Sequence, residues 1–272
     1  MKVFQDFDYD IQYDYADYQK KEGKRDYAVV FKYMGNETKV TVPSEIEGFP
    51  VISMSDSFTS REEMEEIILP EQLERISYGC FRDCKKITKI TLPETLISIG
   101  TEAFSGCTSL EEILCPETPE WLDNISLGNR DLGQNIFENC PKLCDVKGFV
   151  LLHSLLAGYD GRNTEISIPK GVTKLADFTF WEQKKLKSVT VPDSVKTLGN
   201  GVFFKCQGLE EINLPDGIKI FPNETFRRCT SLKSIVFPEK LEEIHHDVFH
   251  GCSKLQNIQW NENLKFFWDG NF

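Results

Sequence analysis

The amino-acid sequence repeats with a period of about 23 residues, and this period limits the possible folds more than any other feature of the chain. The stretch from Leu73 reads LERISYGCFRDCKKITKITLPET, and the next, from Leu96, reads LISIGTEAFSGCTSLEEILCPET. A copy one residue shorter covers 51–72, and four more full copies begin at Val172, Val195, Ile218 and Leu241. One such unit cannot bury its own apolar face, so consecutive copies are expected to stack as the coils of a solenoid.

The copies share the template L-x-x-I-x-x-x-A-F-x-x-C-x-x-L-x-x-I-x-L-P-x-x. Its I-x-L alternation predicts one short strand per coil, with the strands of successive coils parallel and about 4.8 Å apart. The proline that follows lacks an N–H and ends the pairing. The phenylalanine is expected to fill the wider side of the coil. In the copy from Val195 that residue is Phe203, which lies one full period before Phe226, and Phe204 becomes an additional outward aromatic residue.

The cysteines follow the same period. Six of the nine occupy the C position of the template, namely Cys84, Cys107, Cys140, Cys206, Cys229 and Cys252. An odd number of cysteines at the spacing of the repeat does not predict a disulfide framework, and the paired short spacings of a zinc site are missing. We expect these six to be reduced, buried and stacked between coils.

The repeated AF-x-x-C-x-x-L and I-x-L-P signatures, from about Asp26 to the end, resemble the BspA-like leucine-rich repeat family, the short bacterial class of leucine-rich repeats. The segment YMGNETKVTVPSEIEGFPV, 33–51, resembles the lead-in that precedes the first full repeat in that family. The resemblance implies an α/β, β-dominated, right-handed solenoid. Parallel strands would line its concave face, and short helical or irregular turns its convex face. It also implies a protein that binds other macromolecules, usually at a cell surface.

The departures from the period predict how one solenoid domain, 1–272, is organised. Residues 1–50 are expected to form an N-terminal cap, with a hairpin between Tyr27–Tyr33 and Thr38–Val42 around a Gly35-Asn36 turn. Repeats cover 51–118 and 172–263. Between them, 119–171 holds a degenerate repeat, extra residues around 128–134, and an inserted hairpin built from the two apolar runs of GFVLLHSLLAGYDGRN. Residues 264–272 open a further repeat that stops near Phe272.

Composition and motifs exclude several function classes. The formal charge of −12 opposes binding to nucleic acid or to an anionic membrane. The first residues do not form a secretory signal, and no run of 18 apolar residues could span a bilayer, so the sequence alone predicts a cytoplasmic protein where the resemblance predicts a surface protein. Phosphate-binding, dinucleotide-binding, metalloprotease and nucleophile-elbow motifs do not occur. We therefore expect no catalytic residues and no cofactor. His246 and His250, in HHDVFH, are the weak candidates for a metal pair.

The outward residues of the I-x-L strands form the candidate binding face. A concave sheet with acidic pairs and scattered apolar residues suits a protein or peptide ligand. The alternative is a carbohydrate, which would stack on Trp121, Trp181, Trp260 or Trp268. A homodimer through the aromatic C-terminal edge is a further alternative to a self-capped end. The candidate residues are Glu66, Ile68, Lys89, Thr91, Glu112, Leu114, Ser188, Thr190, Glu211, Asn213, Ser234, Val236, Asn257 and Gln259.

Overall fold

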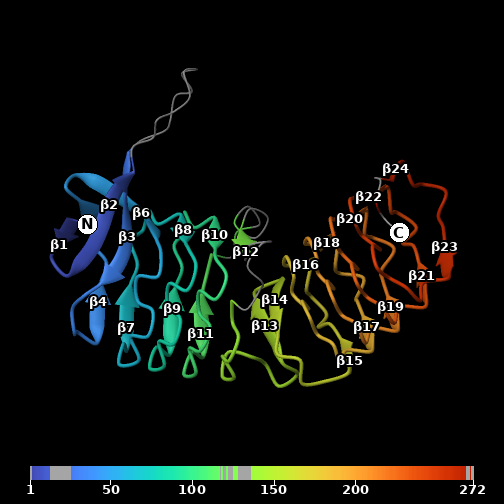
Figure 1. Cartoon of the computed structure of the whole chain (residues 1–272), viewed down its shortest axis with the longest axis horizontal. Helices are drawn as coiled ribbons and strands as arrows, with labels where there is room; N and C mark the ends of the chain where they lie inside the picture. Colours follow the sequence, from blue (N-terminus) through green and yellow to red (C-terminus); the bar gives the residue numbers. More distant parts are fainter. Residues whose placement is uncertain are drawn as a thin grey trace, which may run out of the picture. The chain divides into compact units, whose positions relative to one another are not determined.

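The computed structural model describes residues 2–12, 26–116, 118, 121, 125–127, 136–267 and 270. The expectations that concern 128–134, Trp268 and Phe272 lie outside these residues. Within them, no helix is both long and apolar enough to cross a membrane. The chain divides into two compact units, Met1–Leu143 and Cys144–Phe272 (Figure 1). The single-domain organisation stays a prediction.

Unit 1 is a stack of coils with two series of parallel strands. The first series contains the I-x-L strands, in which β4 (Lys39–Thr41) pairs with β7 (Glu66–Ile68), and β9 (Lys89–Thr91) pairs with β11 (Glu112–Leu114). The second series follows the order β6-β8-β10-β12, and β5 pairs antiparallel with β6. Its strands are β5 (Glu45–Ile46), β6 (Phe49–Met54), β8 (Arg75–Ile76), β10 (Ser98–Ile99) and β12 (Ser126–Leu127).

The second series was not predicted, because the template suggested one strand per coil. Each coil instead contributes a further two-residue strand at the first isoleucine of the template, as at Ile76 and Ile99, which pair in parallel register. Two residues are too short to produce a visible alternation, so only the main-chain pairing between coils shows that they are strands.

The N-terminal cap differs from the predicted hairpin. Tyr27–Tyr33 forms β3, but it pairs antiparallel with β2 (Phe7–Gln12) and parallel with β6, whereas Lys39–Thr41 joins the I-x-L series. The expected hairpin between these two segments is therefore wrong. The hairpin at this end joins β1 (Lys2–Phe4) to β2. Phe7, Tyr9 and Ile11 are buried, so β2 covers the first coil of the core.

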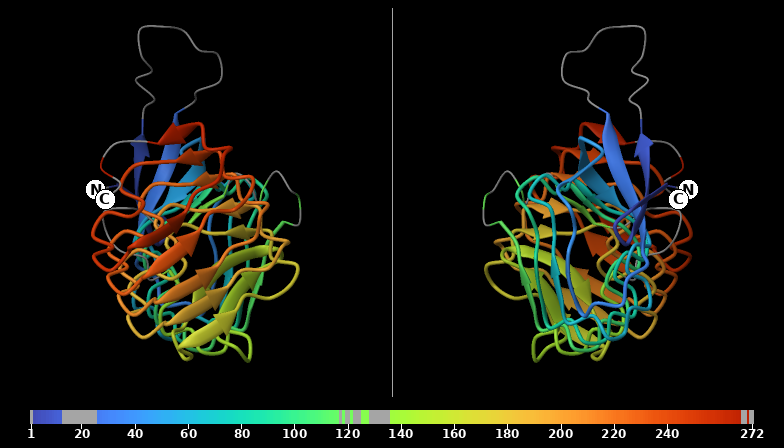
Figure 2. Two further views of the ribbon diagram at one scale, coloured as in Figure 1. Left: turned by 90° about the vertical axis from the view of Figure 1, so that its right-hand side faces the viewer. Right: turned by 90° about the vertical axis from the view of Figure 1, so that its left-hand side faces the viewer.

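Unit 2 begins with the inserted hairpin. Its strands β13 (Phe149–Leu152) and β14 (Leu155–Tyr159) pair antiparallel and are joined by a turn at His153 and Ser154. Strand β14 also pairs in parallel with the strand of the next coil, β16 (Lys174–Leu175). Figure 2 shows the strands of successive coils lying one behind another. The I-x-L series is β15 (Glu165–Ser167), β17 (Ser188–Thr190) and β19 (Glu211–Asn213), followed by β21 (Ser234–Val236) and β23 (Asn257–Gln259). The second series is β14, β16, β18 (Thr197–Leu198), β20 (Ile220–Phe221), β22 (Glu243–Ile244) and β24 (Phe266–Phe267).

The phenylalanine of each repeat forms a continuous column inside its unit. In unit 2, Phe180, Phe203, Phe226 and Phe249 stack with ring centroids 5.2–5.6 Å apart and ring planes within 5° of parallel. In unit 1, the corresponding column joins Phe58, Phe81, Phe104 and Phe137. The assignment of Phe203 to the core is confirmed, since its side chain is fully buried and that of Phe204 is partly exposed.

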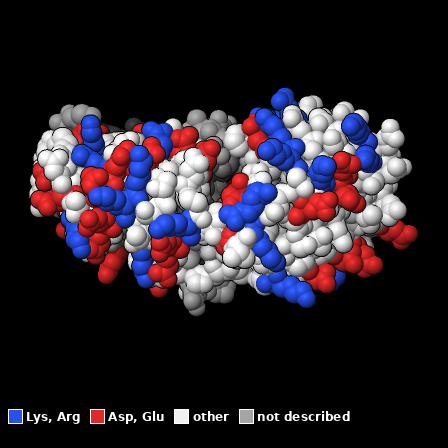
Figure 3. Space-filling model, turned by 90° about the horizontal axis from the view of Figure 1, so that it is seen from below, with Lys and Arg blue, Asp and Glu red and all other residues white. Residues whose placement is uncertain are grey.

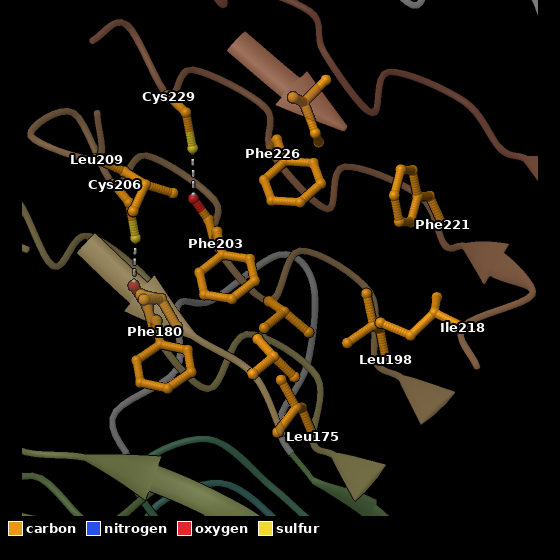
Figure 4. Close-up of a cluster of buried hydrophobic side chains, with 14 of the residues drawn as sticks. Leu175, Phe180, Leu198, Phe203, Cys206, Leu209, Ile218, Phe221, Phe226 and Cys229 are labelled. Atoms are coloured by element: carbon orange, nitrogen blue, oxygen red, sulfur yellow. Dashed lines mark hydrogen bonds between the residues drawn. The ribbon is translucent and has the colours of Figure 1, made fainter. Parts of the chain in front are cut away.

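The six template cysteines connect the coils, as Figure 4 shows for two of them. Each thiol donates a hydrogen bond to the carbonyl of the phenylalanine one coil earlier. The sulfur–oxygen distance is 3.1 Å for Cys229 to Phe203 and 2.9 Å for Cys206 to Phe180. We call these six residues the thiol column. The remaining bonds join Cys84, Cys107, Cys140 and Cys252 to Phe58, Phe81, Phe104 and Phe226.

Tight turns bring the chain around each buried phenylalanine. Phe203 lies between Gly201 and Lys205, which have φ values of 55° and 59°, and Phe249 lies between Asp247 and Gly251, with 59° and 78°. Residues with positive φ two positions before and two positions after the phenylalanine let the backbone reverse its direction on both sides of it. At Gly201 the glycine is required for a second reason, because a Cβ there would collide with the ring of Phe178.

Candidate functional site

The candidate site is built on the outward side chains of the I-x-L strands, which we call the strand face of each unit. In these three-residue strands the central residue is buried or half-buried and its two neighbours point to solvent, as in β7, where Ile67 lies between Glu66 and Ile68. All fourteen predicted residues occupy such outward positions, and Ser188 alone among them is half-buried rather than exposed. Six belong to unit 1, from Glu66 to Leu114, and eight to unit 2, from Ser188 to Gln259.

On the strand face of unit 1, the register aligns these residues in two columns. The first column aligns Lys39 with Glu66, and Lys89 with Glu112. In the second, Thr41 lies beside Ile68 and Thr91 beside Leu114. Strands β7 and β9 lie against each other, so the first column alternates in charge and the second alternates threonine with an aliphatic residue.

The charges of the first column form ion pairs between neighbouring coils. Lys39 Nζ lies 3.2 Å from Glu66 Oε2, and Lys89 Nζ lies 2.6 Å from Glu112 Oε2. Glu111, the other member of its acidic pair, lies 2.8 Å from Lys142. Seen from below, the surface of unit 1 in Figure 3 also has positive and negative side chains next to one another. The acidic pairs read from the sequence are therefore largely neutralised by the lysines of adjacent coils, and such exposed pairs contribute little to stability.

A groove runs over β4, β7 and β9 on this face. It has a volume of about 590 Å³. Its walls include Lys39, Glu65, Ile68, Thr91 and Pro93. Ile68 is 54% exposed, and Leu114, on β11 farther along the same column, is 39% exposed. Four of the predicted binding residues, Glu66, Ile68, Lys89 and Thr91, line the groove. Lys39 was missed because Thr38–Val42 was expected to form a hairpin with Tyr27–Tyr33, whereas its strand pairs with β7 and places Lys39 in register with Glu66.

The strand face of unit 2 is more polar. Thr190, Asn213 and Gln259 occupy the column in which Val236 is the exposed aliphatic residue. Glu210 forms an ion pair with Lys233 at 2.6 Å, which lowers the pKa of the carboxyl and raises that of the ammonium group. The second column therefore has two exposed aliphatic residues in unit 1, Ile68 and Leu114, and one in unit 2, Val236.

The weak metal candidates remain two exposed side chains, His246 and His250, beside the first turn of a coil. The neighbouring His245 approaches Glu243 at 3.1 Å. Across the described ranges, no group of three or more histidine, cysteine or acidic side chains is arranged to hold a metal ion. The geometry gives His246 and His250 no third ligand among these residues.

The tryptophans provide little support for a carbohydrate platform. Trp121 is buried, and Trp260, which is exposed, packs edge-on against Phe237 with centroids 5.2 Å apart. Trp181 is half-buried under Lys205, whose Nζ lies 5.5 Å from the ring centroid. Trp268 lies outside the described residues. The expected group of exposed indoles on one face is not formed by the three that are described.

A second surface cluster, in unit 2, was not predicted from the sequence. Lys205 lies over both Trp181 and Phe204 and forms an ion pair with Glu182, while Arg227 lies over Phe204 from the next coil. The spacing of Glu182 and Lys205 by one full repeat period is the signal that could have predicted this pair. Both cations of this cluster, Lys205 and Arg227, already form ion pairs with acidic side chains of the same unit.

Comparison with known proteins supports the repeat assignment. The model of the BspA type leucine rich repeat region matches six copies, over residues 27–147 and 159–272. Among curated proteins, none matches this chain.

Several solved structures match along most of the chain. A leucine rich cell surface protein from Faecalibacterium prausnitzii is 19% identical, with 96% of this chain and 94% of that chain covered and a TM-score of 0.42. The pneumococcal vaccine antigen PcpA is 17% identical, with 98% and 87% covered and a TM-score of 0.43. A leucine-rich repeat protein from Bacteroides ovatus is 20% identical, with 97% and 90% covered and a TM-score of 0.38.

Proposed function

The chain belongs to the BspA-type leucine-rich repeat family, and from this premise we propose that it is a non-enzymatic protein that binds another protein through the strand face of unit 1. Leucine-rich repeat proteins of this kind typically act as binding scaffolds. The observation that carries the proposal is the groove over β4, β7 and β9, with Ile68 in its wall and Leu114 farther along the same column. Solvation alone would place polar residues at such positions.

The charges of this face support a partner whose contact segment is apolar. Because Lys39, Glu66, Lys89 and Glu112 already pair with one another, the column attracts neither an acidic nor a basic ligand strongly. Buried apolar contacts at the centre of an interface, surrounded by a polar rim, are the usual arrangement of protein–protein contacts. Nucleic acid is disfavoured by the net charge of −12.

We further propose a bacterial cell-surface location and an adhesion-like role. Membership of the family supports this, because its repeats are usually found in proteins that bind other macromolecules at a cell surface. Partner recognition by repeat proteins uses residues spread over several coils, which agrees with the four strands that build this face.

The experiment compares three forms of the chain as immobilised baits for a protein extract. In the first variant, Ile68→Asp and Leu114→Asp are combined. Both side chains are exposed, so the fold should be retained while the two aliphatic residues of the second column are replaced by negative charges. The control is Ile97→Asp, which places one such charge on a 45% exposed isoleucine outside the I-x-L strands. We expect at least one protein to be captured by the wild type and by Ile97→Asp, and to fall at least tenfold with the double variant. Equal capture by all three forms would contradict the proposal.

A further inference from the structure

The I-x-L sheet of unit 1 is interrupted at the groove. Strand β7 pairs with β4, and β9 pairs with β11, but β7 and β9 contact each other without pairing (Figure 1). Each strand at the interruption therefore has one paired edge and one unpaired edge. The two unpaired edges face each other, and residues of both strands line the groove. We call this interruption the seam.

A main-chain hydrogen bond that closes the next coil interface is absent at the seam. After β9, the N–H of Leu92 donates to the carbonyl of Leu114 at 2.8 Å. The equivalent residues one period earlier are Leu69 and Thr91, and between these two described residues no such bond forms. The donor of Leu69 and the acceptor of Thr91 are therefore left without their partner in the neighbouring coil.

The same difference occurs before the strands. The N–H of Glu111 donates to the carbonyl of Thr88 at 2.8 Å, whereas one period earlier the N–H of Thr88 makes no bond to Glu65, although the structure describes both residues. The four residues that lack these bonds all line the groove, namely Glu65, Leu69, Thr88 and Thr91. Main-chain polar groups of proteins are nearly always hydrogen-bonded, so these groups bind water until a ligand replaces it.

The rest of the same coil interface is closed. On the other side of the coil, β6 and β8 pair in parallel register. Before the seam, Lys85 Nζ lies 2.7 Å from Glu62 Oε1, and after it, Thr95 Oγ1 donates to the carbonyl of Glu71 at 2.7 Å. The seam is therefore a local slot in the strand face and not a general separation of the two coils.

The length of the seam matches a short extended peptide. A strand rises about 3.3 Å per residue, so the distance from Glu65 to Leu69 along β7 is about 13 Å. An extended segment of about five residues has this length and presents N–H and C=O groups at the spacing of a strand. Unpaired strand edges bind such segments through main-chain hydrogen bonds, and contacts to alternate side chains provide specificity. Ile68, 54% exposed in the wall of the groove, provides an apolar contact.

We propose that the seam binds an extended segment of the partner protein. The main chain of this segment bonds to the four groups left open between β7 and β9, and one of its aliphatic side chains packs on Ile68. The inference rests on the proposed function for the position of the site, and it adds that recognition at this site uses the main chain of the partner.

Hydrogen exchange of the free chain, followed by NMR, tests whether the seam is open. We expect the amides of Leu69 and Thr88 to exchange at least tenfold faster than those of Leu92 and Glu111, which occupy the same template positions one period later and are hydrogen-bonded. Equal exchange within each matched pair would show that β7 and β9 pair in solution, and the proposal would be wrong.

A displayed library of random heptapeptides, selected on the full chain, tests the occupant. We expect enriched peptides that slow the exchange of the Leu69 and Thr88 amides at least tenfold at saturation. Methylation of their central main-chain nitrogens should weaken binding at least tenfold, as should Ile68→Asp, while Ile97→Asp should leave it unchanged. Selection without enrichment, or enriched peptides that tolerate methylation or leave both amides unprotected, would overturn the proposal.

These measurements use synthetic peptides and not the natural partner, so they can fail independently of the capture experiment. Capture that is lost with the Ile68→Asp and Leu114→Asp pair, together with peptides that leave the seam amides unprotected, would retain the proposed function and remove this inference. Peptides that protect these amides, together with capture that the pair leaves unchanged, would retain the seam as a peptide site and remove the proposed function.

Discussion

Replacing Phe203 with alanine is expected to lower the free energy of unfolding of unit 2 by about 3–5 kcal/mol, the usual cost of removing a buried phenylalanine side chain. Phe203 is fully buried, and its ring stacks between Phe180 at 5.2 Å and Phe226 at 5.4 Å. The rigid column above and below cannot collapse into the space, so the cavity should remain. Urea unfolding followed by tryptophan fluorescence measures the change.

The neighbouring residue provides the control. Phe204→Ala removes the same atoms one position away, from a ring that is partly exposed and lies between Lys205 and Arg227. We expect a loss of about 1 kcal/mol, in the range of ordinary point substitutions. Equal losses at the two positions would show that the repeat register is wrong in this coil.

Raising the pH above 9 is expected to destabilise unit 2 steeply. Burial raises the pKa of the thiols of Cys206 and Cys229 well above the ordinary value of 9.0, and raises that of Cys252 to about 12. An unfolded thiol therefore loses its proton near pH 9 while the folded one keeps it. The stability that depends on these protons is complete below pH 9 and is lost as the pH rises toward the folded pKa. Each thiol contributes a slope of about 1.4 kcal/mol per pH unit, so three together approach about 4 kcal/mol per unit.

The measurement is the free energy of unfolding between pH 8 and pH 10.5 in the presence of a reductant. The variant Cys229→Ala removes one titrating thiol, so its slope against pH should be about one third smaller, whatever its stability at pH 8. Cys144 gives a comparison outside the thiol column, because it is only half-buried. An unchanged slope in Cys229→Ala would mean that the thiol column does not cause the loss of stability above pH 9.

Most of the fold could be predicted because each template position occurs once in every copy of the repeat, so the residue types found there can be compared between copies. A single buried cysteine is uninformative, but six at one template position predict a column, and the structure places all six against phenylalanine carbonyls. The same redundancy assigned Phe203 rather than Phe204 to the core. It also placed Ile68 and Leu114 outward, since the alternation of a strand fixes both faces at once.

The pairing of the N-terminal strands is one feature that the sequence did not predict correctly. Tyr27–Tyr33 and Lys39–Thr41 alternate like the two strands of a hairpin, yet each pairs with a different series. Alternation gives a strand its faces but does not select its partner, and the decisive contact is the distant strand β2. Lys39 was missed in the groove for the same reason. The second, two-residue strands are too short to leave any pattern.

The candidate site was only partly predictable, because its charges act in pairs between coils. Read alone, Glu111 and Glu112 indicate an acidic surface suited to a basic partner. The structure places Lys142 and Lys89 beside them, at 2.8 Å and 2.6 Å. Both lysines belong to neighbouring coils, and Lys89 precedes Glu112 by one full repeat period. The recognition that we propose therefore depends on Ile68 and Leu114, the aliphatic residues of the second column, and not on net charge.

Site-specific photo-cross-linking tests that central claim most directly. A photoreactive phenylalanine analogue at Thr91, an exposed residue in the groove between Ile68 and Leu114, is compared with the same analogue at Ile97, outside the I-x-L strands. Both forms are illuminated in the protein extract used for capture. We expect a discrete cross-linked protein from position 91 that is missing at position 97 and disappears when Ile68→Asp and Leu114→Asp are added. The same products from both positions, or none from position 91, would contradict the account.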